Sequence, residues 1–292
     1  MQKIHVIWNP IAGAGNAKKV FFQVEARLKA LNVDFTHAMS EYAGHAVELT
    51  RQAVEQGKEL IIAIGGDGTI REVAGQLVGG EIPLGIIPSG SGNDLVRALK
   101  IPNDPIAALD IALNGQVRKM DAGSANGEIF FNVAGFGFDV DVLDNTDRFK
   151  SRFGSNASYL MALITTIHKL CLRKAVIETE EGTLKKDVLI LACGNGTHFG
   201  GGMNVAPEAD PFDGKLDFCV ISDVKKRNLP ILLPKFMAGK HLPLKKHVVY
   251  FKGERIMVHC DPASRIQLDG EVMPGTPVEL KVLPGVLPVK VS

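Results

Sequence analysis

Hydrophobic positions in the first 117 residues follow two alternating periods. Short β-branched runs such as KIHVIW and ELIIAI precede longer stretches in which apolar residues recur every three or four positions. This alternation predicts βαβ units with a parallel sheet and right-handed crossovers. The expected strands are residues 3–8, 33–39, 59–64 and 83–88, and the expected helices are Ala17–Leu31, His45–Gln56, Thr69–Val78 and Asp94–Leu99.

After Asp121 the pattern changes to pairs of strand-like runs separated by turn residues, which is typical of antiparallel sheets. The expected bends are at Asn126-Gly127, Glu181-Gly182, Gly253 and Asp269-Gly270, and the expected helices are Ser155–Leu172 and Leu229–Gly239. The sequence therefore predicts an open α/β domain over residues 1–121, to which residues 286–292 return as a strand. A mainly antiparallel β domain, a β-sandwich or an open barrel, is predicted over residues 122–285, and the sandwich is favoured.

Composition supports this division and narrows the function. A chain of 292 residues that is 46% hydrophobic can bury two cores. A net charge of +1 argues against nucleic acid as a partner, because such binding needs an excess of Lys and Arg. The four cysteines form no metal or redox pair, which favours reduced thiols in the cytoplasm. The apolar stretches Tyr159–Leu172 and Leu229–Met237 are shorter than the roughly 20 residues of a membrane span.

Glycine-rich turns follow three of the first four expected strands. They are NPIAGAG at 9–15, GGDGT at 65–69 and PSGSGND at 88–94, and each leads into a helix. Backbone amides and the helix dipole can hold an anion there without a cationic side chain. One such turn is as often structural as functional. Three at neighbouring carboxyl ends of parallel strands predict a nucleotide site.

Asp67 is the one charged residue of GGDGT, and its charge has the same sign as a phosphate. The chain has neither the lysine-containing phosphate loop nor the dinucleotide fingerprint. A carboxylate at this position is explained if the nucleotide arrives with Mg²⁺, which the carboxylate helps to hold. The alternative is that Asp67 caps the helix that begins near Thr69, and the two roles are compatible.

The motifs NPIAG, GGDGT, PSGSGND, AGFGFD, GGGMNVAPEADPFDGKLDF and LDGE occur in this order. In these motifs the chain resembles the diacylglycerol kinase catalytic family, in particular the soluble bacterial lipid kinases of the YegS/BmrU/DgkB type. The resemblance runs from the first strand to about Glu271. GGDGT alone is shared with NAD kinases and phosphofructokinases, whereas its combination with PSGSGND and LDGE is specific.

The resemblance implies a first domain of the NAD kinase and phosphofructokinase type and an ATP-dependent, Mg²⁺-requiring lipid kinase. Such an enzyme would transfer the γ-phosphate to a lipid hydroxyl, with diacylglycerol giving phosphatidic acid. Three alternatives stay open: an NAD kinase, a kinase of sphingoid bases or ceramide, and a non-catalytic nucleotide or lipid sensor on the same fold.

The resemblance also implies roles for particular residues. Glu271 would be the general base, and Asp67 and Asp121 would lie near the active-site Mg²⁺. Read alone, a DGE sequence is more often a solvated turn. The implied ATP site comprises Asn9, Pro10, Ile11, Ala12, Gly13, Ser40, Gly65, Gly66, Asp67, Gly68, Thr69, Ile70, Arg71 and Ser91.

Two further features of the chain depart from, or extend, the family pattern. Ser40 and Ser91 stand where the family usually has threonine, and serine keeps the hydroxyl. The DPFDGKL turn would carry a second, structural Mg²⁺, held by the side chain of Asp213 with Asp210 and Lys215 offering backbone carbonyls. Without the resemblance this turn reads as an ordinary Asp-Gly hairpin.

The lipid partner is only weakly encoded in the sequence. SYLMALITTIHKLCL and NLPILLPKFMAGKHL could line an acyl pocket, although apolar helices are more often plain core. The basic segments DVKKRN, GKH and LKKH flank the second stretch and favour peripheral contact with an anionic membrane, although charge runs are usually solvated. Edge strands of the second domain would allow a homodimer.

Overall fold

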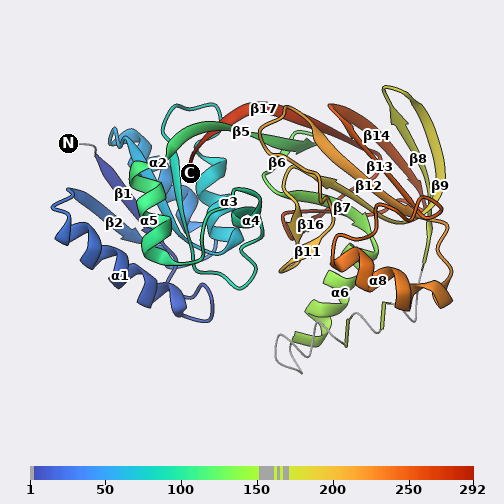
Figure 1. Cartoon of the computed structure of the whole chain (residues 1–292), viewed down its shortest axis with the longest axis horizontal. Coiled ribbons are helices and arrows are strands. Elements are labelled where there is room, and N and C mark those ends of the chain that lie inside the picture. Colours follow the sequence, from blue (N-terminus) through green and yellow to red (C-terminus); the bar gives the residue numbers. More distant parts are fainter. Residues whose placement is uncertain (1–2, 151–160, 163–164, 167–170) are drawn as a thin grey trace.

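The computed structural model describes residues 3–150, 161–162, 165–166 and 171–292. The chain forms two lobes joined by two long strands (Figure 1). In the N-terminal lobe four parallel strands lie in the order β4-β3-β1-β2. Their bounds are β1 Ile4–Trp8, β2 Phe35–Met39, β3 Leu60–Gly65 and β4 Leu84–Pro88. All four predicted strands are confirmed.

Helices follow these strands and pack in pairs, α1 beside α5 and α2 beside α3. The helix α5 was not predicted, although its start signal is strong. The Asp104 carboxylate accepts hydrogen bonds from the amides of Ile106 and Ala107, and Pro105 occupies the first helical position. The bounds are α1 Asn16–Ala30, α2 His45–Glu55, α3 Asp67–Gly75, α4 Asp94–Ala98 and α5 Pro105–Asn114.

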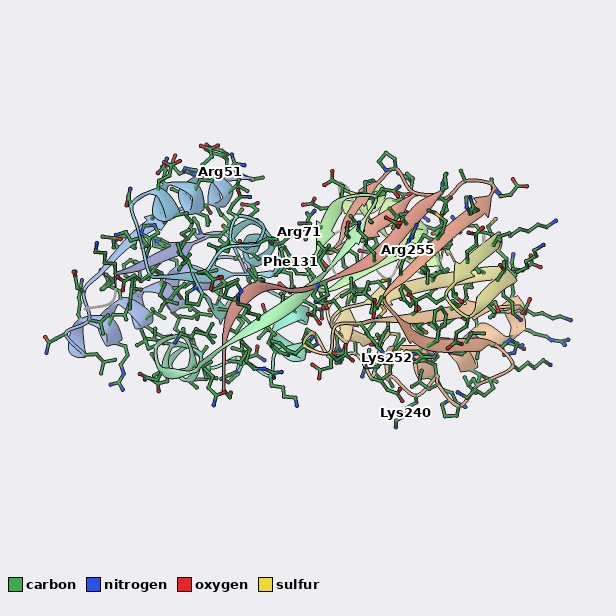
Figure 2. The ribbon with its side chains drawn as sticks, turned by 90° about the horizontal axis from the view of Figure 1, so that it is seen from above. Arg51, Arg71, Phe131, Lys240, Lys252 and Arg255 are labelled. Carbon is green, nitrogen blue, oxygen red and sulfur yellow. The ribbon has the colours of Figure 1, made fainter. Side chains whose placement is uncertain are left out.

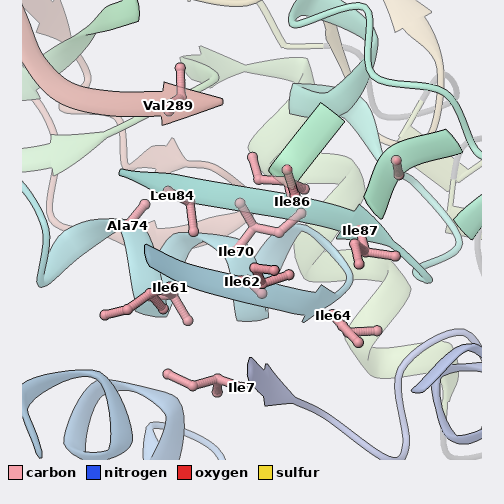
Figure 3. Packing of buried hydrophobic residues seen from close by; sticks show 14 of the residues in the cluster. Ile7, Ile61, Ile62, Ile64, Ile70, Ala74, Leu84, Ile86, Ile87 and Val289 are labelled. Carbon is pink, nitrogen blue, oxygen red and sulfur yellow. The ribbon is translucent and has the colours of Figure 1, made fainter. Parts of the chain in front are cut away.

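The core of the N-terminal lobe lies where these strands are covered by helices on both faces. Figure 3 shows isoleucines of β1, β3 and β4 packed beside Ile70 of α3. Strands buried on both faces read as continuous apolar runs, which explains LIIAIG and LGIIP. Val289, near the end of the chain, joins this core and is opposite Leu84 in a parallel pairing.

A continuous sheet of 15 strands runs through both lobes, and β17 carries it across. β17 pairs with β4 in the first lobe and with β14 in the second, and it pairs with β5 along most of its length. These two strands form the curved ribbon at the top of Figure 1. The remaining bounds are β5 Gln116–Ala125, β6 Glu128–Phe130, β7 Val133–Gly137, β8 Arg173–Thr179, β9 Gly182–Gly194, β10 His198–Phe199, β11 Met203–Asn204, β12 Leu216–Ser222, β13 Val248–Gly253, β14 Arg255–Asp261, β15 Ile266–Leu268, β16 Glu271–Met273 and β17 Val278–Val291.

The C-terminal lobe has two apolar layers, and β9 contributes to both. Val188 and Leu191 of β9 point into the interior between the strands, whereas Leu189 and Ile190 point toward helices α6 and α8. The predicted β-sandwich is therefore covered on one side by α6 (Phe138–Lys150) and α8 (Leu229–Met237), with a 3₁₀ turn at Lys226–Asn228 before α8. Among the described residues, no helix is both long and apolar enough to cross a membrane.

Two elements predicted for this lobe were the strand pair around Gly253 and a helix over Ser155–Leu172. The bend at Gly253 is not a hairpin, because β13 pairs with β12 whereas β14 pairs with β8 and β17. The chain crosses there from one part of the sheet to another. The helix expected over Ser155–Leu172 falls mostly outside the described residues.

Candidate active site

A cavity of about 610 Å³ opens at the carboxyl ends of β1, β2, β3 and β4. The glycine turns that follow these strands form its floor, as expected for an open parallel sheet. Ten residues of the ATP site implied by the resemblance line this cavity, which is called the nucleotide cavity after that expectation: Asn9, Pro10, Ile11, Ala12, Gly13, Ser40, Gly66, Gly68, Thr69 and Ser91.

Direct contacts hold the three turns together. The Asn9 side-chain amide donates to Thr69 Oγ1 at 3.1 Å, which links the turn after β1 to α3. The turn after β4 packs against the turn after β3 so closely that a Cβ on Gly90 would collide with the Cα of Gly66. Glycine at position 90 is therefore required by the close approach of two backbones.

The other residues of the implied ATP site lie elsewhere. Ile70 is fully buried in the core, and Gly65 ends β3 with no space for a side chain beside Thr69. The side chains of Asp67 and Arg71 line a second cavity. Six residues that were not predicted also line the nucleotide cavity: Met39, Glu41, Tyr42, Ala43, Glu72 and Gly90.

Glu72 has a structural task that its sequence context did not reveal. Its carboxylate accepts hydrogen bonds from the amides of Gly44 and Ala46, at 3.0 and 3.2 Å. It therefore satisfies the free amides at the start of α2 from the neighbouring helix α3. No local pattern could have shown this, because the two segments are 26 residues apart or more.

The second cavity, of about 240 Å³, lies between the lobes and is mostly apolar. Its polar end is formed by Asp67, Arg71 and Asp94 of the first lobe and by Gln267 and Asp269 of the second. Most of its apolar side chains come from α6, β9, the β10–β11 hairpin and α8: Phe138, Val142, Leu143, Ile190, Phe199, Met203, Leu233, Phe236 and Met237. Leu95 of α4, Phe131 and Val133 complete the apolar lining. The segment around α8 thus lines a cavity, whereas most of the other expected acyl-pocket segment, residues 158–172, lies outside the described residues.

Asp67 is the first residue of α3, two residues earlier than the expected helix start at Thr69. Its Oδ1 accepts hydrogen bonds from the amides of Asp94 at 2.8 Å and Leu95 at 3.4 Å. The capping alternative therefore needs correction, because Asp67 caps α4 rather than its own helix. Its neighbours Gly66 and Gly68 line the nucleotide cavity, so Asp67 stands between the two cavities.

Asp94 was missed as a site residue. It is buried, and its carboxylate contacts Arg97 at 2.8 Å. It also accepts a hydrogen bond from the Gly201 amide of the second lobe, at 2.7 Å. Burial raises the pKa of Asp94, and the nearby charge of Asp67 raises it further against the effect of the Gly201 amide and Arg97. The signal was present in PSGSGND, where an acid opens a helix beside a phosphate-type turn.

The two carboxylates converge on Gly92, whose missing side chain leaves space beside them. A Cβ there would lie 2.8 Å from Asp67 Oδ2 and 3.6 Å from Asp94 Oδ2. Two carboxylates beside an open space fit Mg²⁺, which usually keeps several water ligands and takes one or two from protein. The described residues contain no cluster of three or more metal-binding side chains.

Glu271 is the first residue of β16 and follows Asp269 and Gly270, which line the second cavity, although Glu271 itself is not among the lining residues. Asp269 and Gly270 both have positive φ, as the predicted two-residue hairpin requires. The Asp269 carboxylate accepts three backbone amides, those of residues 131 to 133, which fixes the hairpin in place. Burial raises the pKa of Asp269, while these amides act in the opposite direction. The Glu271 side chain forms an ion pair with Arg71 of α3.

Asp121 lines neither of these cavities. Its carboxylate oxygens accept the amides of Gly285, within β17, and Gly214, in the DPFDG turn, both at 2.7 Å. It thus ties together β5, β17 and this turn where the two lobes join. Its expected place near a catalytic Mg²⁺ stays a prediction.

At the DPFDGKL turn, Asp213 already has a cationic partner. Lys252 Nζ lies 2.7 Å from Asp213 Oδ2 and 3.4 Å from Asp217 Oδ2, and Asp217 is fully buried. The Asp210 carbonyl accepts the Asp213 amide at 3.3 Å. A divalent ion held by the Asp213 side chain would have to displace this lysine. The metal role of Asp210, Asp213 and Lys215 therefore stays a prediction.

Comparisons with known proteins agree with this architecture. Residues 3–125 match the diacylglycerol kinase catalytic domain, and residues 132–291 match the YegS C-terminal NAD kinase beta sandwich-like domain. A diacylglycerol kinase of Mycobacterium tuberculosis is 32% identical, over 98% of this chain and 94% of that protein. One of Bacillus subtilis is 29% identical, over 96% and 94%.

Solved structures support the same fold. A diacylglycerol kinase from Bacillus anthracis superposes with a TM-score of 0.76 at 21% identity, covering 100% of this chain and 97% of that one. A second structure from this organism gives a TM-score of 0.82 at 25% identity, covering 100% and 95%. The chain therefore belongs to the diacylglycerol kinase catalytic family, as a lipid kinase of the YegS type that transfers a phosphoryl group from ATP to an alcohol.

Proposed function

We propose that this lipid kinase phosphorylates the primary hydroxyl of diacylglycerol and so produces phosphatidic acid. The observation that supports it is the position of Asp67, between a cavity built from phosphate-type turns and an apolar cavity. A nucleotide in the first cavity and an acyl chain in the second would bring the γ-phosphate and the lipid hydroxyl to the same carboxylate. The second cavity is hereafter called the acceptor cavity.

The glycine turns and the hydroxyls of Ser40 and Ser91 would bind the triphosphate through amide and hydroxyl donors. Asp67, with Asp94 beside it, would hold Mg²⁺, which neutralises charge on the phosphate oxygens. Phosphoryl transfer depends mainly on such positioning and neutralisation rather than on covalent chemistry by the protein.

Glu271 would act as the general base. Its carboxylate takes the proton of the acceptor hydroxyl while the hydroxyl oxygen forms a bond to the γ-phosphorus. The bond from the γ-phosphorus to the bridging oxygen breaks, and ADP leaves with that electron pair. Glu271→Gln should fold and bind ATP yet lose nearly all transfer.

Transfer of labelled γ-phosphate to lipids in mixed micelles tests the substrate. The panel contains diacylglycerol, a sphingoid base, ceramide and NAD, and products are separated by chromatography. Label in phosphatidic acid supports the proposal. Label mainly in a phosphorylated sphingoid base, in ceramide phosphate or in NADP assigns the corresponding alternative, and no label in any product supports the non-catalytic sensor. Asp110→Asn is the control for acid substitutions, because Asp110 lies exposed on α5.

A membrane surface would deliver the lipid near α8. Ile231 and Met237 of this helix are exposed at 65% and 40%, and Lys235, Lys240 and Lys245 lie on it or close after it. Sedimentation with anionic and zwitterionic liposomes tests this contact, and binding that is indifferent to lipid charge and salt would exclude an electrostatic role.

A homodimer through an edge of the sheet is a separate prediction. β13 pairs with β12 alone among the described strands, so its other edge is available. Light scattering coupled to size-exclusion chromatography measures the mass. A monomer across the micromolar range would contradict this prediction.

A further inference from the structure

Arg71 and Glu271 form an ion pair across the cleft between the lobes. This ion pair joins residues 1–121 to the second lobe. The other ion pairs between described residues named here each lie within a single lobe. Figure 2 shows Arg71 in the space between the two lobes. Its side chain is mostly buried, with 21% exposed, whereas that of Glu271 is 66% exposed.

The helix α3 presents a different face to each cavity. Gly68, Thr69 and Glu72 line the nucleotide cavity, whereas Asp67 and Arg71, one helical turn apart, line the acceptor cavity. The resemblance implied that Arg71 belongs to the ATP site. Its position on the helix directs the guanidinium toward the acceptor instead.

Among the residues that the structure describes, the Glu271 carboxylate pairs with Arg71 alone, although the backbone of its hairpin is fixed through Asp269. A glutamate side chain that is two-thirds exposed keeps much of its rotational freedom unless a partner restricts it. Ion pairs with a partner this exposed contribute little to the stability of the fold. Orientation, rather than stability, is therefore the main effect of Arg71 on Glu271.

We propose that Arg71 is a positioning residue for phosphoryl transfer, which acts by orienting the Glu271 carboxylate. The guanidinium pairs with Oε2 and leaves Oε1 to take the proton of the acceptor hydroxyl. Because Arg71 belongs to the nucleotide lobe and Glu271 to the lipid lobe, the base is aligned only when both lobes are in this arrangement. This inference rests on the proposed role of Glu271 as the base.

A double-mutant cycle tests it, with Arg71→Met, Glu271→Gln and the double variant assayed in mixed micelles. Arg71→Met should lower kcat about 10- to 100-fold with the KM for ATP unchanged, because orientation is lost and nucleotide binding is not. Arg71→Lys should recover part of kcat. The double variant should be no slower than Glu271→Gln, since Arg71 acts through that carboxylate. Arg51→Met is the matched control, because Arg51 pairs with Gln76 on the outer side of α2 and α3.

The contrary outcomes are distinct. A higher KM for ATP at unchanged kcat would return Arg71 to the nucleotide site and overturn the proposal. A double variant slowed by the product of the two single effects would show that Arg71 acts independently, which also overturns it. Wild-type turnover in Glu271→Gln would remove the base and this inference together. Slow Glu271→Gln with unaffected Arg71→Met would overturn the inference alone.

Discussion

The nucleotide cavity and the acceptor cavity meet at α3 but are built in different ways. The first is lined mainly by short runs of residues at the carboxyl ends of four neighbouring strands. The second collects side chains from both lobes, from Asp67 to Gly270. A local turn can therefore specify the phosphate site, whereas the acceptor site exists only when the whole chain is folded. A substitution in one cavity should therefore affect the kinetics of one substrate, whereas a substitution at Asp67 should affect both.

The largest effect is expected at Asp67, which serves both cavities. Asp67→Asn keeps an oxygen that can accept the Asp94 amide but loses the charge that would hold Mg²⁺. We expect kcat to fall about 10³-fold, comparable to the loss of a strong electrostatic contact in an active site. The thermal midpoint should fall only slightly, since the cap on α4 is kept in part. Steady-state kinetics and calorimetry measure both, and turnover close to that of Asp110→Asn would contradict the role.

The next largest effect should be confined to the nucleotide cavity. Gly90→Ala places a methyl group against Gly66, so the two phosphate turns must separate. We expect kcat/KM for ATP to fall about 10²-fold, because small displacements of a bound reactant are costly. The KM for the lipid should be unchanged. Gly75→Ala is the control, since a Cβ at Gly75 on the same helix as Asp67 meets nothing within 4 Å.

A change confined to the acceptor cavity should have the opposite signature. Leu233→Trp fills space between α8 and β9, and we expect the KM for lipid to rise about tenfold with the KM for ATP unchanged. Val54→Trp is the control, because Val54 is exposed on α2 of the first lobe, away from the acceptor cavity and from the proposed membrane surface. Equal effects of the two tryptophans would show that the cavity does not hold the lipid.

The smallest effect is expected outside both cavities, at Lys252. Lys252→Met leaves Asp213 and the buried Asp217 without their cation, although the Tyr250 hydroxyl still donates to Asp217 at 2.6 Å. Because the lysine is about one-third exposed, we expect a loss of about 1–2 kcal/mol, or roughly 4 °C in Tm. Lys186→Met, which breaks the exposed pair with Asp223, should cost less.

Mg²⁺ titrations of the same variants test the metal at the DPFDGKL turn. If the lysine occupies the cation position, Mg²⁺ should raise the Tm of Lys252→Met and leave that of the wild type and of Lys186→Met nearly unchanged. A wild-type Tm that falls with a chelator and recovers with Mg²⁺ in an Asp67→Asn background would instead support the divalent site implied by the resemblance.

The same contrast explains what the sequence could predict. The strands and turns of the first lobe follow local rules, because buried parallel strands are continuous apolar runs and phosphate turns need glycine. Asp94 was visible in PSGSGND, and α5 was visible in Asp104-Pro105. These two were missed although the signal was local.

Other features had no local signal. The face of α3 that Arg71 occupies depends on where the second lobe packs, 200 residues later in the chain. The residues that line the acceptor cavity have the same apolar character as core residues, so composition cannot separate a pocket from a core. The chain at Gly253 likewise looked like a hairpin in the sequence. Its two strands do not pair with each other, because β13 pairs with β12 and β14 pairs with β8, and no local signal shows this.

The strand β17 also has a consequence for the order in which the protein acquires its structure. A ribosome releases the glycine turns and β1 to β4 first. β4 can then pair with β3, but its other neighbour, β17, is absent until residues up to Val291 have been synthesised. Val289 and Val291 are buried in the first lobe's core, which is incomplete until then. We therefore expect the first lobe, with the turns proposed to bind ATP, to complete its core only after the second lobe has been synthesised.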